Sequence, residues 1–314
     1  MNADTVSRLI CQFIRFEEPL ALLGIYFLSS TLLHLTWSTL SGLHYYVLAQ
    51  WFSSRDYRCY GRWAVVMIEP GALTYYYAEE LAKKKLDIKL ICGERDETVV
   101  ERFAIHLHQT YKVAAEVLVL DYSSEGDQIE TLLSCLENNL KNLDIGVIVN
   151  QLPTPHSPGP HVTVSRCDLD DNIRTIALMT HLIKLGISKM RTQRRGCIVN
   201  IGHVSGEYPH AHLAAYGASC MFVDYFSRGL SREAACHNIH IQSLTPHLDS
   251  IEDDAICTWI SVKPHTVARH AVNGIGKRRS YGYWMYGLRG FLASCVPMCF
   301  RSFYTNTLMI RHCD

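Results

Sequence analysis

The chain has 314 residues, of which 48% are hydrophobic, and its 30 Lys and Arg residues balance 30 Asp and Glu residues. This length suffices for one large α/β domain of about 250 residues with an appendage. Zero net charge gives no electrostatic reason for nucleic-acid binding, which we therefore exclude. The 12 cysteines lack the paired spacing of a zinc ribbon, and His203, His210 and His212 have no acidic or cysteine ligand at a matching spacing. We therefore predict no metal centre.

The N-terminal region, residues 1–59, contains a long apolar stretch. Residues 19–54 include no Asp, Glu, Lys or Arg. About 20 apolar residues cross a bilayer, so the stretch fits one tilted membrane span or a bent hairpin. A cleavable signal is disfavoured because the stretch is too long and follows Glu17 and Glu18. An amphipathic segment on the membrane surface and a helix pair packed on the chain's own core are alternatives. We predict a membrane-associated helical segment.

From residue 60 onward, apolar runs alternate with helical patterns. Runs typical of buried strands occupy residues 63–68, 88–92, 116–120, 145–150, 198–201 and 239–244. Helical patterns fall between them, around residues 77–81 and over residues 97–109, 129–140, 170–189 and 216–235. Strands this apolar require cover on both faces, which predicts a doubly wound parallel sheet of Rossmann type over residues 60–280. Residues 281–314 form an apolar, aromatic tail that could cover a substrate cleft or touch a membrane.

Four segments of this region carry a family resemblance: residues 60–66, 77–81, 144–150 and 222–227. They resemble the short-chain dehydrogenase/reductase family, and the likeness covers nearly the whole chain. Within the family, the chain is similar to the membrane-anchored branch of 17-beta-hydroxysteroid dehydrogenase type 3 and the very-long-chain 3-ketoacyl-CoA reductases. The strongest likeness is to a hydroxysteroid dehydrogenase-like member regarded as inactive. The resemblance implies a Rossmann-like fold, an NADP(H) site, and a Tyr-x-x-x-Lys pair that transfers a proton to a ketone.

The phosphate-binding loop implied by the resemblance has lost its glycines. The family has T-G-x-x-x-G-x-G after the first strand, and the three glycine positions fall on Ile68, Ala72 and Thr74. The β-branched residues resist positive φ and fill the space of a phosphate. Pro70 removes one N–H from the loop, whereas Gly71 could restore a turn in a shifted register. This loop predicts weak dinucleotide binding, with Gly71 and Ala72 as vestigial contacts.

The rest of the implied cofactor site is also altered. Arg95 stands near the position that faces a 2′-phosphate, but Glu94 beside it would repel that group. Asp121 matches the residue that contacts adenine, or else it caps a helix. Asn150 keeps the first position of the family's N-N-x-G, and Pro153 replaces its glycine. Arg95, Asp121 and Asn150 therefore complete a vestigial cofactor set.

The implied catalytic set keeps its tyrosine but not its lysine. Tyr216 opens an apolar helical run, and the lysine position one helical turn later holds Cys220. Free tyrosine has a pKa near 10, so without a neighbouring cation it suits a reductive acid better than an oxidative base. Asn172 aligns with the asparagine that holds a relay water. The position of the substrate-orienting serine holds His203, and Ser205 is the nearest hydroxyl.

These losses favour a catalytically inactive family member that acts by binding or scaffolding, with no cofactor expected. The alternative is an NADPH-dependent reductase of steroid or 3-ketoacyl substrates, with Tyr216 as the acid. In that case Asn172 serves the relay, and Ser205 or His203 orients the carbonyl. A third hypothesis is a steroid- or acyl-lipid-binding protein that reuses the substrate cleft. The resemblance further implies a homodimer through the helix at residues 216–235, contact with membrane lipid, and location in the endoplasmic reticulum membrane, with the mitochondrion as the alternative.

Overall fold

The structure is a computed structural model that describes residues 3–44, 56–120, 129–153, 159–207, 209–247 and 262–294. The chain divides into two compact units, Met1–Trp51 and Phe52–Asp314. Asp121, one of the predicted cofactor residues, lies outside the described residues.

The first unit is one helix, α1 (Ala3–Leu43), which continues through Pro19. Its segment Ala21–Gly42 is long enough and apolar enough to cross a membrane, by length and composition alone. Large apolar side chains of this segment, such as Phe27 and Trp37, are exposed. The hydroxyls of its threonines donate to backbone carbonyls of the preceding turn, so they need no water as a partner. The predicted apolar helical segment is therefore present as a single continuous helix.

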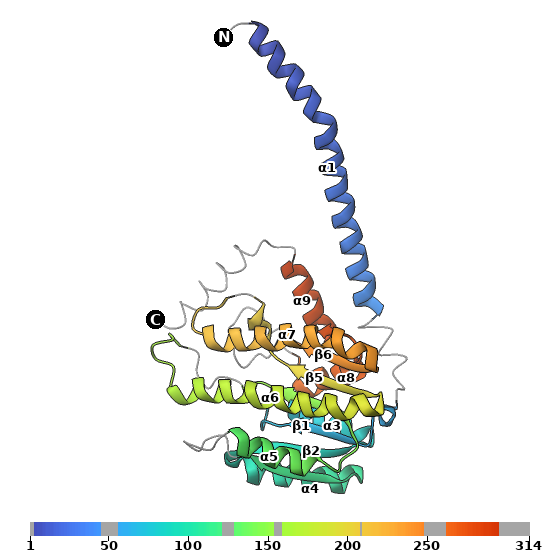
Figure 1. The fold of residues 1–314 in the computed structure, drawn as a ribbon, viewed down its shortest axis with the longest axis vertical. Coiled ribbons are helices and arrows are strands. Elements are labelled where there is room, and N and C mark those ends of the chain that lie inside the picture. The colour runs from blue at the N-terminus through green and yellow to red at the C-terminus, as the bar shows by residue number, and fades with distance from the viewer. Residues whose placement is uncertain are drawn as a thin grey trace. The chain divides into compact units, whose positions relative to one another are not determined.

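The second unit contains a seven-stranded parallel sheet, with strand order β3-β2-β1-β4-β5-β6-β7 (Figure 1). Its strands are β1 (Trp63–Met67), β2 (Asp87–Gly93), β3 (Ala115–Leu120), β4 (Ile145–Gln151), β5 (Gly196–Ile201), β6 (Ile239–Leu244) and β7 (Arg279–Ser280). The chain winds outward from β1 in one direction to β3, and in the other from β4 to β7. The predicted doubly wound sheet is confirmed, since the order reverses between β1 and β4.

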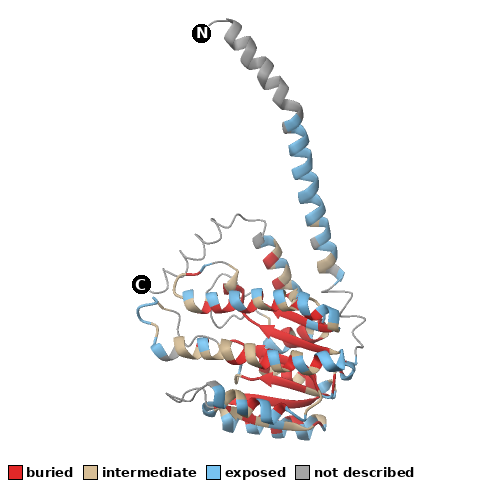
Figure 2. Ribbon diagram, in the orientation of Figure 1, coloured by how far each residue is buried: buried red, intermediate tan, exposed pale blue. Residues whose placement is uncertain are grey.

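Helices cover both faces of this sheet. One face packs against α3 (Leu73–Lys83), α4 (Glu97–Tyr111) and α8 (Pro264–Asn273), and the other against α5 (Ile129–Leu140), α6 (Arg166–Gln193) and α7 (Ala214–Ala234). Successive side chains of β1 enter the two cores in turn: Val66 joins the first, and Val65 and Met67 join the second. Figure 2 shows the buried strands between layers whose outer faces are exposed. Short 3-10 turns complete the unit at Tyr57–Cys59, Glu94–Asp96, Val204–Gly206 and Ala235–His237.

The C-terminal helix α9 (Trp284–Ser294) follows β7 and belongs to the same unit. Its Tyr286 is buried in the first core, and Tyr281 and Tyr283 pack against that core from the preceding loop. The predicted domain limits at residues 59 and 280 remain predictions. Residues 295–314 of the predicted tail lie outside the described residues.

Two glycines set the backbone approach that places β1 beside β4. A Cβ on Gly146 would lie 2.4 Å from the backbone nitrogen of Gly61, and Gly61 itself has φ +153°. The backbone N–H of Trp63 then donates to the carbonyl of Asp144 at 2.9 Å. Any side chain at Gly146 would force the two segments apart. This approach brings together the amino ends of β1 and β4, at the edge of the sheet opposite the candidate site.

Candidate functional site

The predicted site residues collect at the carboxyl ends of the central strands, the usual ligand edge of an open parallel sheet. Two cavities lie there. The first, of about 440 Å³, is lined by the segments that follow β1, β2 and β4 and by one turn of α6. The second, of about 250 Å³, lies between α7, β7 and α9. Tyr216 and Cys220 are held on α7, and His203 and Ser205 follow β5.

Tyr216 and Cys220 form a buried pair without a cation. Their exposed fractions are 4% and 0%. Burial raises the pKa of the Tyr216 phenol well above its usual value of 10, and the Cys220 thiol and the Glu69 carboxylate raise it further. Burial also raises the pKa of the Cys220 thiol to about 11, against smaller opposing contributions from Tyr216, His203 and Ser205. Both groups are therefore neutral at physiological pH, so Tyr216 can donate a proton but offers almost no phenolate as a base.

His203 and Ser205 are hydrogen-bonded to each other. The backbone N–H of Ser205 donates to Nδ1 of His203 at 3.1 Å, and the Ser205 hydroxyl lies 2.9 Å from the same nitrogen. Because a backbone N–H can only donate, Nδ1 is the acceptor and the hydroxyl also donates to it. The Ser205 hydroxyl is thus engaged with His203 inside the protein. The imidazole ring lies 6.0 Å from the Tyr216 ring.

Asn172, the predicted relay residue, is buried on α6 beside Asp171, which lines the first cavity. Asn172 itself is not among the described residues that line either cavity. The structure therefore places Tyr216, Cys220, His203 and Ser205 together, and Asn172 in the neighbouring helix. The catalytic roles of these residues remain predictions.

One backbone donor of the predicted phosphate-binding loop is taken by a side chain of the protein itself. Gly71 takes a left-handed turn at φ +79°, with open space where a Cβ would stand, and Ala72 precedes α3 without a side-chain cap. The backbone N–H of Thr74 donates to Oε1 of Gln151 at 3.2 Å. A dinucleotide places its phosphates at the helix N-terminus after the first strand, because the free backbone N–H groups there donate hydrogen bonds to them. Here Gln151, from the end of β4, accepts the hydrogen bond of one of those N–H groups.

The first cavity also has the wrong charge for a diphosphate. Among the described residues, four carboxylates line it, from Glu69, Glu94, Asp96 and Asp171, together with the guanidinium of Arg95. The formal charge of these five described side chains is −3, from four negative groups and one positive group. Burial first, and then the charge of Asp96, raise the pKa of the neighbouring Cys92 thiol to about 11. Arg95 is exposed at the rim, beside the Glu94 that was predicted to oppose it.

Asn150, the last described member of the predicted cofactor set, is held in a buried polar chain. Its amide donates to Oδ1 of Asn200 at 2.8 Å, and the Asn200 amide donates to the Ser227 hydroxyl at 2.8 Å. Ser227 donates to the carbonyl of Val223, which closes the chain on α7. The amide is therefore engaged inside the protein, and it links β4 and β5 to α7.

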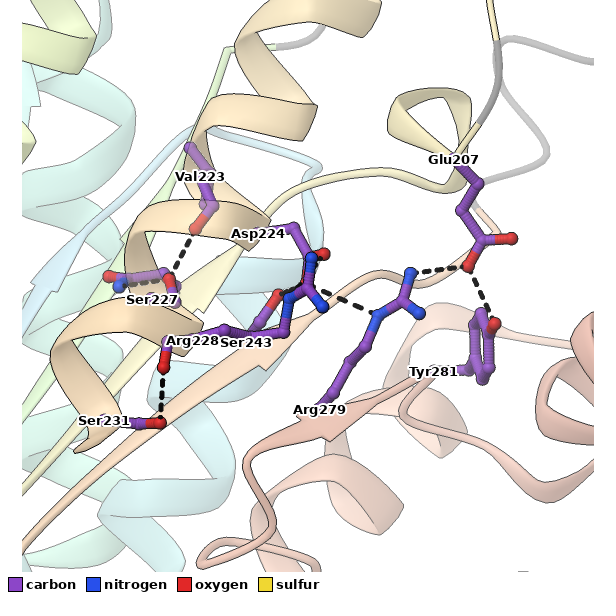
Figure 3. Close-up of polar contacts among 10 residues, drawn as sticks. Glu207, Val223, Asp224, Ser227, Arg228, Ser231, Ser243, Arg279 and Tyr281 are labelled. Atoms are coloured by element: carbon purple, nitrogen blue, oxygen red, sulfur yellow. Dashed lines mark hydrogen bonds and ion pairs between the residues drawn. The ribbon is translucent and has the colours of Figure 1, made fainter. Parts of the chain in front are cut away.

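Sequence reasoning missed the ion-pair network beside the second cavity (Figure 3). Arg279 of β7 contacts Glu207 at 2.8 Å and Asp224 at 3.4 Å, and Arg228 contacts Asp224 at 3.1 Å. Glu207 also accepts a hydrogen bond from the Tyr281 hydroxyl. The only local signal was the spacing of Asp224 and Arg228, one helical turn apart. The network draws α7, β7 and the loop after β5 together.

Cys220 and His203 line this second cavity, and neither is among the described residues that line the first. Cys220, at the position of the family's cofactor-binding lysine, therefore faces the cavity beside the ion-pair network in this chain. Among the side chains that the structure describes, no three His, Cys, Asp or Glu residues are placed to hold a metal ion.

The chain is similar to known proteins in sequence and in fold. The family model for short chain dehydrogenases matches residues 63–249. Inactive hydroxysteroid dehydrogenase-like protein 1 of Homo sapiens is 30% identical over 295 residues, which are 90% of this chain and 87% of that protein. Very-long-chain 3-oxoacyl-CoA reductase of Anas platyrhynchos is 31% identical over 248 residues, 76% of each protein. The crystal structure of a bulky-bulky ketone specific alcohol dehydrogenase from Comamonas testosteroni matches with a TM-score of 0.56 at 23% identity, over 68% of this chain and 82% of that one. The resemblance to this family and branch is confirmed.

Proposed function

The chain belongs to the short-chain dehydrogenase family, and we propose that it is a catalytically inactive member that acts by binding or scaffolding. The observation that carries this proposal is the altered phosphate site. Gln151 takes a donor at the start of α3, and the five described charged side chains of the cavity in front of that helix have a formal charge of −3. Without a bound dinucleotide there is no hydride to transfer. The name of the human relative as inactive supports the same conclusion.

The buried Tyr216–Cys220 pair supports the loss of one direction of the family chemistry, the oxidation of an alcohol. The family chemistry requires a cation that holds the pKa of the tyrosine down toward neutral pH. In this chain, burial and Cys220 raise the pKa of Tyr216. Oxidation of an alcohol would need phenolate, which this environment suppresses.

Direct titration of the purified full-length protein with NADPH and with NADH, by calorimetry, tests the proposal. A ligand at about a thousand times its Kd stabilises a protein by about 4 kcal/mol, so micromolar affinity would raise the melting temperature clearly at millimolar cofactor. We expect neither heat nor stabilisation. A Cys220→Lys variant and an Ile68→Gly/Thr74→Gly/Cys220→Lys variant are the matched controls, since they restore family residues at the degenerate positions. Micromolar binding by the unaltered chain would refute the proposal.

One observation favours the alternative, an NADPH-dependent reductase. Tyr216 stays protonated, and a reductase needs its tyrosine only as an acid. This candidate predicts ketone-dependent NADPH oxidation that Tyr216→Phe abolishes. Asn172, His203 and Ser205 would serve it in the relay and at the carbonyl, and the cavity charge argues against it because NADPH carries several phosphate charges.

Location and partners belong to the same proposal. We propose that α1 associates with a membrane, because its exposed apolar segment Ala21–Gly42 has the length and composition of a span. The endoplasmic reticulum membrane is the proposed location, and the mitochondrion is the alternative. A homodimer through α7 is supported by the exposed Met221, Phe222 and Tyr225. A steroid or acyl-lipid ligand is the third candidate, and binding of such a ligand without nucleotide would favour it.

A further inference from the structure

The turns that lead into the strands carry a concentrated positive charge. All seven strands run parallel, so these turns lie together at the edge of the sheet where the strands begin. They hold ten Lys and Arg residues against two acidic residues, within residues 56–62, 84–86, 112–114, 141–144, 194–195, 235–238 and 274–278. The described turns at the opposite edge hold two basic and four acidic residues. A chain of zero net charge thus gathers positive charge at one edge, which we call the basic edge.

We infer that the basic edge docks on the anionic headgroups of a membrane surface. The inference rests on the proposed membrane association of α1, and it goes beyond that proposal because it assigns an orientation to the second unit. The strands would begin on the lipid side, and the candidate site at their carboxyl ends would lie on the side of the water.

Most of the basic side chains at this edge are open to water. Seven of the ten are exposed, and the other three are half-buried. Arg62 pairs with the buried Asp87, and Arg195 pairs with Asp144. Four exposed members of the set pair with no carboxylate among the described residues: Lys112, Lys141, Arg194 and Arg278. The folded unit therefore leaves this charge available to an anion outside the protein.

Helix geometry accounts for only part of the charge. Basic side chains complement the dipole at the end of an α-helix, which explains Lys85, Lys112 and Arg194. These three residues take a positive φ, between +53° and +66°, which glycine adopts at lower cost. Arg62 and residues 277–278 lie beyond the last turn of any described α-helix. No helix end requires their charge, so the basic edge carries more charge than the fold needs.

The path of the chain favours a membrane as the partner. Residues 44–56 connect α1 to Tyr57, and the chain then passes through the basic edge to reach β1 at Trp63. A membrane span formed by Ala21–Gly42 would thus be joined to the second unit at its basic edge. Lys and Arg side chains beside an anionic leaflet are attracted to it within a distance of about 10 Å. The acidic turns at the opposite edge would be repelled, so charge favours one orientation.

Lysine acetylation by a water-soluble ester tests the inference on the full-length protein in lipid nanodiscs. Mass spectrometry measures the rate at each lysine in neutral phosphatidylcholine discs and in discs with about 30% phosphatidylserine. Lys112 and Lys141 should react at least about threefold more slowly in the anionic discs. Lys184 and Lys263, which are exposed outside the basic edge, should react at the same rate in both. Salt at about 1 M should remove the difference, since the Debye length is then about 3 Å. Equal rates in the two discs at all four lysines would overturn the inference.

Charge variants locate the docking surface. Arg194→Gln/Arg278→Gln removes two charges from the basic edge, and it should reduce the protection of Lys141 about twofold. Arg102→Gln/Arg269→Gln removes two charges from exposed positions on α4 and α8 outside that edge, and it should leave the protection unchanged. An equal loss of protection in both double variants would show attraction to net charge alone and would overturn the inference.

The neutral discs separate this inference from the membrane association of α1. Entry into neutral discs without slower acetylation in anionic discs refutes only the docking. Failure to enter neutral discs refutes the proposed association of α1, and flotation with phosphatidylserine vesicles then decides the docking. Flotation that high salt reverses would support it, and absence of flotation would overturn it.

Single-stranded RNA is the rival partner for a basic surface. An RNA oligonucleotide added to the protein in neutral discs tests this alternative by the same acetylation rates. Slower acetylation of Lys112 and Lys141 with RNA, without any effect of phosphatidylserine, would overturn the inference in favour of nucleic acid. We expect the reverse result.

Discussion

Oε1 of Gln151 accepts a hydrogen bond from the backbone N–H of Thr74 at 3.2 Å, so the end of β4 caps the first turn of α3. Both residues are buried, and the bond joins two elements that are far apart in sequence. The side-chain oxygen of Gln151 thus accepts a hydrogen bond that a phosphate oxygen accepts at the helix N-terminus of a dinucleotide-binding protein.

Gln151→Ala should lower the free energy of unfolding by about 1 kcal/mol, the usual cost of losing a helix cap. Urea unfolding followed by circular dichroism measures this change. Gln193→Ala, at an exposed position at the end of α6, is the control and should be neutral. Equal stability of the two variants would mean that the Gln151 bond contributes nothing to folding.

Cys220→Lys should lower the pKa of Tyr216, because a cation one turn along α7 favours the phenolate. Ring-carbon NMR of labelled tyrosine, titrated upward in pH, follows this group directly. In the unaltered protein and in Cys220→Ser, the Tyr216 signal should keep its neutral position beyond pH 10, since burial is the largest cause of its raised pKa. If Cys220→Lys leaves the titration where Cys220→Ser has it, position 220 does not control this phenol.

Asp224→Asn should cost about 2 kcal/mol of stability, because Arg279 and Arg228 both pair with that buried carboxylate. The cost stays below that of a fully buried pair, since both guanidinium side chains are partly exposed and water screens them. Chemical denaturation measures the loss. Glu233→Gln, exposed on the same helix, should change stability by less than about 0.5 kcal/mol.

His247 should make the protein less stable as the pH falls below neutrality. Burial lowers its pKa to about 3, with smaller contributions from Arg289 and His203, whereas an unfolded histidine titrates at about 6.5. The unfolded state therefore binds the proton first. The stability is fully present above pH 6.5 and is lost as the pH falls from 6.5 toward 3.

The matched variants are His247→Phe and His265→Phe. His247 packs on the Tyr286 ring at 5.5 Å, where phenylalanine can replace it, and His265 is exposed on α8. Between about pH 6.5 and pH 5, His247→Phe should lose about 2 kcal/mol less stability than the unaltered protein, from the proton that no longer binds on unfolding. His265→Phe should follow the unaltered protein. Parallel pH dependences for all three proteins would contradict the role of His247.

The sheet was predictable because its signal is local. Apolar runs predicted β1, β4 and β6 to within a residue or two. The family's Tyr-x-x-x-Lys spacing, counted from Tyr216, placed Cys220 at the lysine position. The starts and ends of helices were less exact: α6 begins at Arg166, before the predicted residue 170, and charged residues at positions 166, 168, 170 and 171 obscure the apolar pattern of its first turns.

The rest of the site depends on residues that meet only after folding. Glu94 was recognised beside Arg95, but Glu69, Asp96 and Asp171 join it from three other segments. The bond between Gln151 and Thr74 required the pairing of β1 with β4. Glu207 and Arg279 lie on separate elements, so no periodicity could connect them.

The buried chain from Asn150 through Asn200 to Ser227 ties the ends of two central strands to α7 without any outside molecule. Hydrogen bonds within the chain stabilise the fold whether or not a cofactor is bound. We expect the cellular lifetime of such a protein not to depend on the concentration of NADPH. An enzyme that is stabilised by its bound coenzyme would depend on that concentration.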